Sequence, residues 1–340
     1  MKRMQKRARG SLLCAVLFFV LLQLGLNITV ETVRPDLYDP EYGHRLRLLK
    51  RQQAKSPSKS LVVILGSSRP QLGISPAAMP DMGCVVFNFG IAGFGPVGEM
   101  FAFNRILADG VKPDTIFLEI LAPALHAEAN VEDFLKIQRV GWNDLSLMAS
   151  FSHRPTKLYW DWCSRRFAVC HAVRLCLMSR LAPGFLPWRD RLDVTWQRID
   201  EYGFQPFPMT EFTAEQRRIG TDDAIRSYQG VLKDFKVADM PRASIEHILT
   251  ECKARNIRVV LFAMPEGSEF RNAYPTGAWQ KVEAFTNELR ERFGVEFISF
   301  RESMPDEALF DSHHLTPDAA KVFSQQFGRE VRRIVAPDAD

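Results

Sequence analysis

The stretch Leu61-Val62-Val63-Ile64-Leu65-Gly66-Ser67-Ser68-Arg69-Pro70 sets the fold class of this chain. Its first five residues are all apolar and rich in β-branched side chains, which is typical of a strand buried on both faces, as in a parallel sheet. Gly66 ends the run, and a turn with two serines follows. Since ligands bind at the carboxyl ends of strands in an open parallel sheet, this turn is a candidate position for a reactive side chain.

Further apolar runs repeat the strand pattern along the chain. They are residues 84–87 (CVVF), 115–118 (TIFL), 257–262 (IRVVLF) and 295–298 (VEFI). Helical patterns lie between them at 96–107, 241–255 and 278–293, and a last helix begins at Thr316-Pro317-Asp318. Strands that alternate with helices predict an α/β domain with a parallel sheet and right-handed crossovers, here over residues 60–124 and 241–340.

The alternation is interrupted between about Leu125 and Met240. A crossover needs only about a dozen residues, so residues 125–240 are predicted to form a mainly helical insertion. It either caps the site or only adds packed surface. Its aromatic and basic residues are suited to an anionic glycan or a lipid headgroup; they are Trp142, Trp160, Trp162, Trp188, Trp196, Arg165, Arg166, Arg189 and Arg191.

The N-terminus predicts a membrane anchor. Residues 11–30 (SLLCAVLFFVLLQLGLNITV) carry no charge, and a helix of that length spans a hydrocarbon core of about 30 Å. Residues 1–10 contain basic but no acidic side chains, which keeps this tail in the cytoplasm. We therefore expect a single-pass protein of the inner membrane whose C-terminal part lies in the periplasm.

Several features bear on this anchor. Gln23 and Asn27 make the span less apolar, and basic residues at 45–51 also follow it. A cleaved signal peptide is the alternative, but no small-x-small cleavage site follows the apolar run. Residues 31–59 mix charges with Pro and Ser, which predicts a stalk, with a basic helix near 45–53.

The composition is that of a globular protein, with 46% hydrophobic and 25% charged residues in 340. A net charge of +4 is too small for this length to indicate a nucleic-acid partner. The cysteines outside the predicted span form no CxxC pair of the kind found in zinc sites. A disulfide among Cys163, Cys170 and Cys176 suits an oxidising compartment, although buried free thiols are the simpler expectation.

Two more blocks have the composition of an active site. Residues 88–96 (NFGIAGFGP) place small residues at a strand-to-helix turn, where backbone N–H groups can point into a cleft. Near the C-terminus, Phe310-Asp311-Ser312-His313-His314-Leu315 precedes the last helix. An Asp three residues before a His can accept the imidazole Nδ1 proton, which leaves Nε2 free to take a proton from a serine.

In this order, the three blocks resemble the SGNH, or GDSL-type, superfamily of serine esterases and acyltransferases. The resemblance covers about residues 60–122 and 243–334. It implies a three-layer, doubly wound, flavodoxin-like sheet, with Ser68 as nucleophile, His314 as general base and Asp311 orienting His314. The backbone N–H groups of Ser68 and Gly93 would then hold the oxyanion, and neither a cofactor nor a metal is implied.

The chain departs from the family pattern at two positions. Ser67 replaces the Asp that precedes the nucleophile, a residue that only supports the turn. The family's third block offers an Asn to the oxyanion, whereas Pro123 lies near that position and has neither a side-chain donor nor an N–H. Losing one oxyanion donor costs about 10² to 10³ in rate. Arg69 is a candidate replacement, and a salt bridge is its alternative role.

The chain also resembles, more loosely, membrane-anchored SGNH-like proteins that accompany O-acyltransferases of cell-surface polymers. This implies an acyl ester or carbohydrate substrate and a membrane-bound O-acyltransferase as partner. The expected function is a serine esterase or O-acyltransferase, and the alternative is a catalytically weak scaffold, which Pro123 favours. A metal site at Asp311, His313 and His314 would lack a further ligand at recognisable spacing. Glu119 and Glu266, at predicted strand ends, receive no role.

Overall fold

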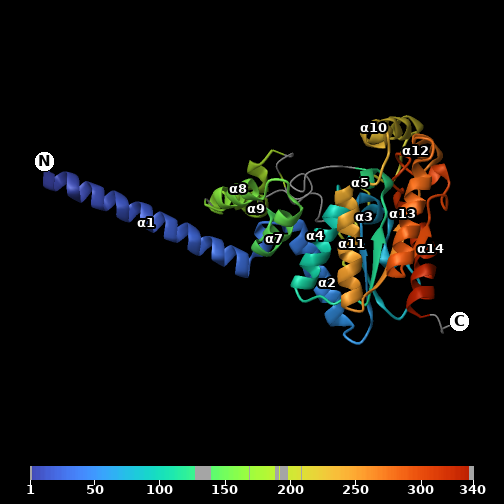
Figure 1. Cartoon of the computed structure of the whole chain (residues 1–340), viewed down its shortest axis with the longest axis horizontal. Helices are drawn as coiled ribbons and strands as arrows, with labels where there is room; N and C mark the ends of the chain where they lie inside the picture. The colour runs from blue at the N-terminus through green and yellow to red at the C-terminus, as the bar shows by residue number, and fades with distance from the viewer. Residues whose placement is uncertain are drawn as a thin grey trace. The chain divides into compact units, whose positions relative to one another are not determined.

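A five-stranded parallel sheet forms the centre of the computed structural model. Its order is β2-β1-β3-β4-β5, the flavodoxin-like order, in which the chain changes direction across the sheet between β1 and β3. The strands are β1 (Leu61–Leu65), β2 (Val85–Asn88), β3 (Thr115–Glu119), β4 (Arg258–Ala263) and β5 (Glu296–Ser299). The predicted α/β fold with a parallel sheet is therefore confirmed (Figure 1).

The structure describes residues 2–126, 139–167, 169–187, 191, 198–207 and 209–336. Trp188, Arg189 and Trp196 of the expected insertion lie outside these residues. The chain divides into two compact units. One comprises residues 1–44 and 130–197, and the other, which contains the sheet, comprises residues 45–129 and 198–340.

The helices of the sheet unit start and end where the sequence provides caps. Proline occupies the first position of α4 and of α14, where the missing N–H costs no helical hydrogen bond, and Gly294 ends α13 at a φ of 70°. The helices are α3 (Ser68–Gly73), α4 (Pro96–Ala108), α5 (Ala122–His126), α10 (Ala214–Leu232), α11 (Asp239–Ala254), α12 (Ser268–Asn272), α13 (Ala278–Phe293) and α14 (Pro317–Val335), with 3-10 turns η2 (Pro76–Ala78) and η7 (Asp306–Ala308).

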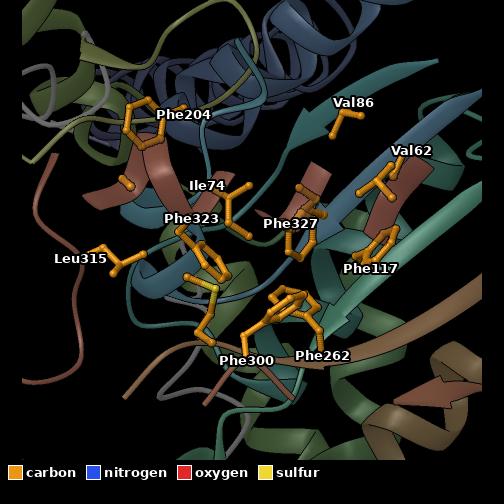
Figure 2. Close-up of a cluster of buried hydrophobic side chains, with 14 of the residues drawn as sticks. Val62, Ile74, Val86, Phe117, Phe204, Phe262, Phe300, Leu315, Phe323 and Phe327 are labelled. Atoms are coloured by element: carbon orange, nitrogen blue, oxygen red, sulfur yellow. The ribbon is translucent and has the colours of Figure 1, made fainter. Parts of the chain in front are cut away.

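One face of the sheet packs against α14. Phe327 of this helix lies 5.1 Å from Phe117 of β3 and 5.3 Å from Phe262 of β4, measured between ring centroids (Figure 2). Val62 of β1 and Phe323 of α14 belong to the same buried cluster. Side chains alternate between the two faces along a strand, so the strand residues of this cluster are two positions apart, as Val62 and Ile64 are in β1.

The other face of the sheet is equally buried. Its strand residues include Val63, Leu118 and Leu261, none of which is exposed. On this side, α4 contacts β1, α11 contacts β4, and the two helices contact each other. Burial of both faces accounts for strands that are apolar at almost every position.

Helix α2 (Pro40–Lys55) occupies much of the segment predicted as a stalk. Two of its side chains, Arg45 and Leu49, are fully buried. Arg45 Nη1 donates to the backbone carbonyls of Asn88, at 3.2 Å, and Gly203, at 2.7 Å. From Arg45 onward, this helix is therefore a packed part of the sheet unit.

The first unit is helical in the residues described. Its elements are α1 (Lys2–Val33), η1 (Pro35–Leu37), α7 (Trp142–Phe151), α8 (Pro155–Arg166), α9 (Val169–Leu181) and η4 (Pro183–Phe185). Within α1, residues Arg7–Val33 are long and apolar enough to cross a membrane once, by length and composition. Cys163 and Cys176 are free thiols, and the side chain of Cys170 lies outside the described part of the chain.

Candidate active site

Ser68 begins α3, directly after the turn that ends β1. Ser67 is the N-cap of this helix, and its hydroxyl accepts the N–H of Arg69 at 3.2 Å. The cap fixes the first turn of α3 by satisfying one of its free donors. The Ser68 side chain, which is half-buried, therefore stands at the carboxyl end of β1.

The turn beneath Ser68 is packed against the end of β3. Ser67 N–H donates to Glu119 Oε2 at 2.7 Å, and this carboxylate is fully buried. A Cβ on Gly66 would lie 2.4 Å from Pro70 Cγ and 2.8 Å from Glu119 Oε2. Only glycine fits there, so Gly66 allows β3 and α3 to approach the turn closely.

Ser68, His314 and Asp311 are joined by two short hydrogen bonds. Ser68 Oγ lies 2.7 Å from His314 Nε2, and His314 Nδ1 lies 2.7 Å from Asp311 Oδ2. With the proton on Nδ1, the ring donates to the carboxylate and accepts from the hydroxyl. The structure thus brings together the three side chains that the sequence predicted, although Ser68 and Asp311 lie more than 240 positions apart in the chain.

Asp311 is held in its ionised form. Burial alone would raise the pKa of this carboxyl, but the hydrogen bond and the charge of His314 lower it to about 2. The other carboxylate oxygen, Oδ1, accepts the backbone N–H of His314 at 2.8 Å. An ionised carboxylate with both oxygens bonded fixes the orientation of the imidazole.

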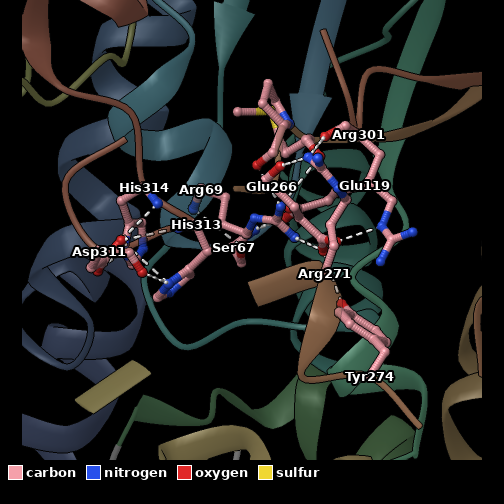
Figure 3. Close-up of polar contacts among 12 residues, drawn as sticks. Ser67, Arg69, Glu119, Glu266, Arg271, Tyr274, Arg301, Asp311, His313 and His314 are labelled. Carbon is pink, nitrogen blue, oxygen red and sulfur yellow. Dashed lines mark hydrogen bonds and ion pairs between the residues drawn. The ribbon is translucent and has the colours of Figure 1, made fainter. Parts of the chain in front are cut away.

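His313 has different surroundings. Its ring stacks on Phe270 at a centroid distance of 5.1 Å and meets Tyr228 edge-on at 5.6 Å. Burial, followed by the charge of His314, lowers the pKa of His313 to about 3. His313 is therefore neutral near pH 7, and it is a packed residue of the loop (Figure 3).

The loop that carries Asp311 and His314 is held at both ends. Phe310 N–H donates to the carbonyl of His314 at 2.8 Å, and Thr316 N–H donates to the carbonyl of Ala308 at 2.9 Å. Ser312, at the tip, has a φ of 65°, a left-handed conformation that non-glycine residues rarely adopt. Such backbone strain persists only where the surroundings impose it.

Helix α10 braces the same loop from outside. Arg217 Nη1 donates to the backbone carbonyls of Leu309, at 2.5 Å, and Glu307, at 2.9 Å. A Cβ on Gly220 would lie 3.1 Å from the Cβ of Asp311, so the absence of a side chain lets α10 come close. This helix comes from the expected insertion, and it contacts the loop that holds the acid and the imidazole.

The backbone donors predicted for an oxyanion are unoccupied. Within the described residues, neither the Ser68 N–H nor the Gly93 N–H donates a hydrogen bond. The turn that contains Gly93 lies against the nucleophile turn, since Ile91 N–H donates to the carbonyl of Gly66 at 2.9 Å. Gly93 is exposed and has a φ of 79°.

The structure engages Arg69 elsewhere. Its side chain is buried; Nη1 lies 3.2 Å from Glu266 Oε1, and Nη2 donates to the carbonyls of Met264, at 3.2 Å, and Pro265, at 2.8 Å (Figure 3). These contacts connect α3 to the segment after β4. The geometry therefore favours the salt bridge over the alternative that Arg69 donates to an oxyanion.

Pro123 lies within α5 and is buried. As a proline it has no backbone N–H to donate. The next residue, Ala124, packs closely against Gly95 of the turn at residues 88–96: a Cβ on Gly95 would lie 2.7 Å from the Ala124 methyl carbon. The structure thus shows no replacement for the family's Asn at Pro123 itself.

Two residues that received no role in the sequence position the turn of Ser67 and Ser68. Asn88, at the end of β2, donates from Nδ2 to the carbonyls of Pro70 and Ile74, both at 2.6 Å, and its Oδ1 accepts the N–H of Gly90 at 2.9 Å. Glu119, at the end of β3, accepts from Ser67. Their position as the last residue of a strand was the signal available in the sequence.

Glu266 organises a buried polar cluster behind Arg69. Its carboxylate accepts from Tyr274 OH at 2.8 Å and from Arg301 Nε at 2.6 Å (Figure 3). Burial and the charge of Glu266 raise the pKa of Tyr274 well above its usual value, so the phenol stays a donor. Glu266 thus pairs with the buried Arg69 and the half-buried Arg301, and within the described residues its carboxylate has no contact with Ser68, His314 or Asp311.

The metal alternative shares two side chains, Asp311 and His314, with the hydrogen-bonded set of Ser68, His314 and Asp311. The ligand atoms of Asp311, His313 and His314 lie within 4.8 Å of one another. Both nitrogens of His314 and both oxygens of Asp311 are, however, already in hydrogen bonds. An ion at this position would have to break the contact between His314 and Ser68 or the contact between His314 and Asp311.

No family model and no curated protein sequence matches this chain. Among solved structures, the chain is similar to that of a proposed acylhydrolase from Bacteroides fragilis, at 12% sequence identity and a TM-score of 0.35. The match covers 84% of this chain and 96% of the other. A TM-score this low adds no support for a fold or an activity, so the functional assignment depends on the residues of the site.

Proposed function

We propose that this chain is a serine esterase or O-acyltransferase of the SGNH type. The observation that supports the proposal is the relay from Ser68 through His314 to Asp311, with 2.7 Å at each step. A hydroxyl, both imidazole nitrogens and a buried carboxylate in this order are what an activated serine requires. The relay also stands at the carboxyl ends of parallel strands, where such sheets bind ligands.

In the proposed reaction, Ser68 Oγ attacks the carbonyl carbon of an acyl ester while His314 Nε2 takes the hydroxyl proton. Asp311 keeps the ring oriented and stabilises the imidazolium that forms. The backbone N–H groups of Ser68 and Gly93 receive the negative charge of the tetrahedral intermediate. The intermediate then expels the alcohol, to which His314 returns the proton, and an acyl ester of Ser68 remains.

The second half of the reaction regenerates Ser68. Water or a carbohydrate hydroxyl gives its proton to His314 and attacks the acyl carbon, and the protonated His314 then returns a proton to Ser68 Oγ. The acceptor that we propose is a cell-surface polysaccharide or a similar polymer, and the proposed partner is a membrane-bound O-acyltransferase. Both follow from the looser resemblance described for the sequence.

We also propose that α1 anchors the chain in the inner membrane, with the sheet unit in the periplasm. The apolar stretch Arg7–Val33 supports the span, and the basic residues that precede residue 11 support the orientation.

A second candidate function is that of a catalytically weak scaffold within an O-acyltransferase complex. Two observations favour it: Pro123 replaces the expected oxyanion donor, and the guanidinium of Arg69 is bonded to Glu266 and to backbone carbonyls. With one oxyanion donor fewer, turnover would fall by about 10² to 10³.

A fluorophosphonate probe separates the two functions. If Ser68 is an activated nucleophile, the full chain becomes labelled and Ser68→Ala does not, and esterase activity in the variant falls by roughly 10³ or more. Ser67→Ala is the matched control: it removes the neighbouring hydroxyl and an N-cap, costs about 1 kcal/mol of stability and keeps the labelling. An unlabelled wild-type chain with intact folding would favour the scaffold.

A further inference from the structure

Helix α1 carries a stripe of polar residues in its C-terminal half. Gln23, Asn27 and Glu31 follow one another at intervals of four, so they share one face of the helix. Gln23 is only 8% exposed, and its Oε1 accepts the backbone N–H of Val169 at 2.9 Å. A polar residue that weakens an apolar span thus has a defined partner at the start of α9.

The other two residues of the stripe meet a buried arginine. Arg166 Nη1 donates to Asn27 Oδ1 at 3.1 Å and to Glu31 Oε2 at 3.3 Å. The guanidinium also lies over the ring of Tyr38, 3.7 Å from its centroid. Arg166 therefore joins α1 to its neighbours through Nη1 and its stacking on Tyr38, and the second half of α1 is a packed element of the first unit.

Apolar contacts continue along the same side of α1. Leu26 and Val30 pack against Tyr38, Val169 and Val173. Nearer the N-terminus, the ring of Phe19 lies 5.9 Å from the ring of Phe167, which follows α8. Phe167 and Val169 therefore lie beside Phe19 and Gln23, well inside the stretch that is apolar enough to cross a membrane.

Helix α9 runs from that level towards the end of α1. Its first residue, Val169, is bonded to Gln23, whereas Arg180, near its last residue, pairs with Asp36 at 2.9 Å. At about 1.5 Å per residue, Phe19 lies roughly 16 Å before Val30 along α1. If a hydrocarbon core of about 30 Å ends near Val30, the contact of Val169 with Gln23 lies within the leaflet on that side, and the contact of Phe167 with Phe19 lies near the inner limit of that leaflet.

The surface of these helices carries exposed apolar side chains. Outside α1, and within the described residues, seven of the ten large apolar side chains that are exposed lie between 142 and 185. Among them, Trp160 is 74% exposed, Leu181 81% and Phe185 84%. The full set is Trp142, Tyr159, Trp160, Phe167, Met178, Leu181 and Phe185.

Basic side chains accompany the apolar ones. Arg154, Lys157 and Arg174 are exposed on α8, on α9 or next to them. Aromatic rings and flexible cations together are typical of segments at a membrane interface, where rings enter the acyl boundary and cations meet phosphates. This composition and the depth of the contacts with α1 favour lipid over a protein partner.

We propose that α8, α9 and η4 form a membrane-interface platform, seated in the leaflet beside the C-terminal half of α1, with phospholipid as the partner. Figure 1 shows α8 and α9 near this half of α1. The platform rests on the anchor proposed above and is independent of the chemistry at Ser68. It also assigns a role to Gln23 and Asn27, which fasten the platform to the span.

The test uses photoactivatable phospholipids. The full chain is reconstituted alone in vesicles of phosphatidylethanolamine and phosphatidylglycerol that contain a phospholipid with a diazirine in its acyl chain, and the adducts are mapped by mass spectrometry. We expect adducts on residues 155–187 as well as on α1. Adducts on α1 alone would overturn the platform and leave the anchor intact, whereas no adducts on either segment would overturn both.

Matched variants sharpen the measurement. Phe167→Glu is expected to reduce the adducts on 155–167 at least fivefold, because Phe167 lies beside Phe19 within the span and a carboxylate is costly in the acyl region. Val322→Glu, at an apolar position on α14 that is 59% exposed, is expected to change nothing. Equal adducts on α14 and on α8 and α9 would also overturn the proposal. Ser68→Ala should give the wild-type pattern, so loss of catalysis and loss of the platform are told apart.

Discussion

His313 and His314 are neighbours in the chain and have different environments. His314 reaches Ser68 with one nitrogen and Asp311 with the other, while His313 is enclosed by Phe270 and Tyr228. Only the imidazole in contact with a hydroxyl can exchange a proton with it. His314 could be predicted from the sequence because it lies three residues after Asp311. The packing of His313 could not, because it depends on residues far away in the chain.

Substitution of His313 by phenylalanine should make the protein more resistant to acid. Burial lowers the pKa of His313 to about 3, whereas an unfolded histidine titrates near 6.5. Between these values the unfolded chain binds a proton that the folded chain does not, so the free energy of unfolding decreases as the pH falls from about 6.5 to 3, by up to about 5 kcal/mol. His313→Phe keeps the ring and removes this loss.

Acid unfolding followed by circular dichroism measures the effect. The wild-type midpoint should lie within the window of His313, and the midpoint of His313→Phe should be lower. Asp311 acts in a separate window, because its pKa is lowered to about 2 and its stabilisation is lost only as the pH falls below about 3.8 towards 2. Identical midpoints for the two proteins would mean that His313 is not the group that titrates.

Two glycines offer a matched comparison for the oxyanion turn. Gly93 and Gly83 both have a left-handed φ, 79° and 69°, and a Cβ at either would meet no atom within 4 Å. Alanine at either position should therefore cost about 1 kcal/mol of stability through backbone strain alone. Gly93→Ala should also lower kcat/KM at least tenfold, because a strained turn moves the N–H away from the oxyanion.

Gly83→Ala introduces the same backbone strain at a position whose N–H is not a proposed oxyanion donor. Its kcat/KM should stay within about twofold of the wild type while thermal unfolding shifts by the same amount as in Gly93→Ala. Equal activities of the two variants, at equal stability, would remove Gly93 from the proposed oxyanion hole.

Several elements of the sheet unit meet at the turn of Ser67 and Ser68. The residue that ends β2, Asn88, donates to the carbonyls of Pro70, within α3, and Ile74, at its C-cap. The residue that ends β3, Glu119, accepts the Ser67 N–H, and the segment after β4 accepts from Arg69. Residues at or after the ends of three strands thus fix one short helix, which keeps the position of Ser68 independent of any single loop. Preorganisation of this kind is what catalysis by positioning requires.

Helix α10 supports the other half of the relay, and Arg217 is the residue that tests it. Arg217→Met removes a charged donor from the carbonyls of Leu309 and Glu307 and should lower stability by about 1 to 3 kcal/mol. Because the loop then holds His314 less firmly, kcat should fall while KM changes little. Arg217→Lys, which keeps one donor, should restore part of kcat.

Arg226→Met is the control on the same helix. Arg226 is exposed and pairs with Asp223, so its loss should cost less than about 1 kcal/mol and leave kcat unchanged. Steady-state kinetics and thermal unfolding of the three variants decide the matter. If Arg217→Met keeps the wild-type kcat, α10 does not position the loop.

The strands and the candidate site residues could be predicted from the sequence because their signals are local. Apolar runs indicated the strands, and small residues at turns and the three-residue spacing between acid and imidazole indicated the site. The sequence could not show that α10 would brace the loop of Asp311, since that contact joins positions 90 residues apart through backbone carbonyls, which leave no trace in side-chain patterns. The burial of Arg45 in the expected stalk is a similar case, because its partners are also carbonyls of distant residues.

At the scale of the whole chain, the sequence treated the N-terminal span and the tryptophan-rich segment as separate features. The structure connects them within one unit, through Gln23, Asn27 and Arg166. From the sequence alone, Gln23 only makes the span less apolar. In the structure its partner is the backbone N–H of Val169, more than 140 positions later. Hydropathy alone cannot distinguish such a residue from a flaw in the span.

This connection makes a prediction about processing. Since Gln23, Asn27 and Glu31 are bonded into the first unit, removal of the N-terminal segment as a signal peptide would leave the buried Arg166 without its acceptors on α1, a loss of several kcal/mol. The protein should therefore keep residues 1–30, be extracted from membranes only by detergent, and show no loss of mass from this N-terminal segment. A C-terminal reporter that is active only in the periplasm should be active, and exchanging the basic residues at 2–9 for glutamine should reduce its activity by weakening the orientation signal. A mature protein that lacks its first 20 to 30 residues, or a reporter active only in the cytoplasm, would contradict the anchor and the platform that is built on it.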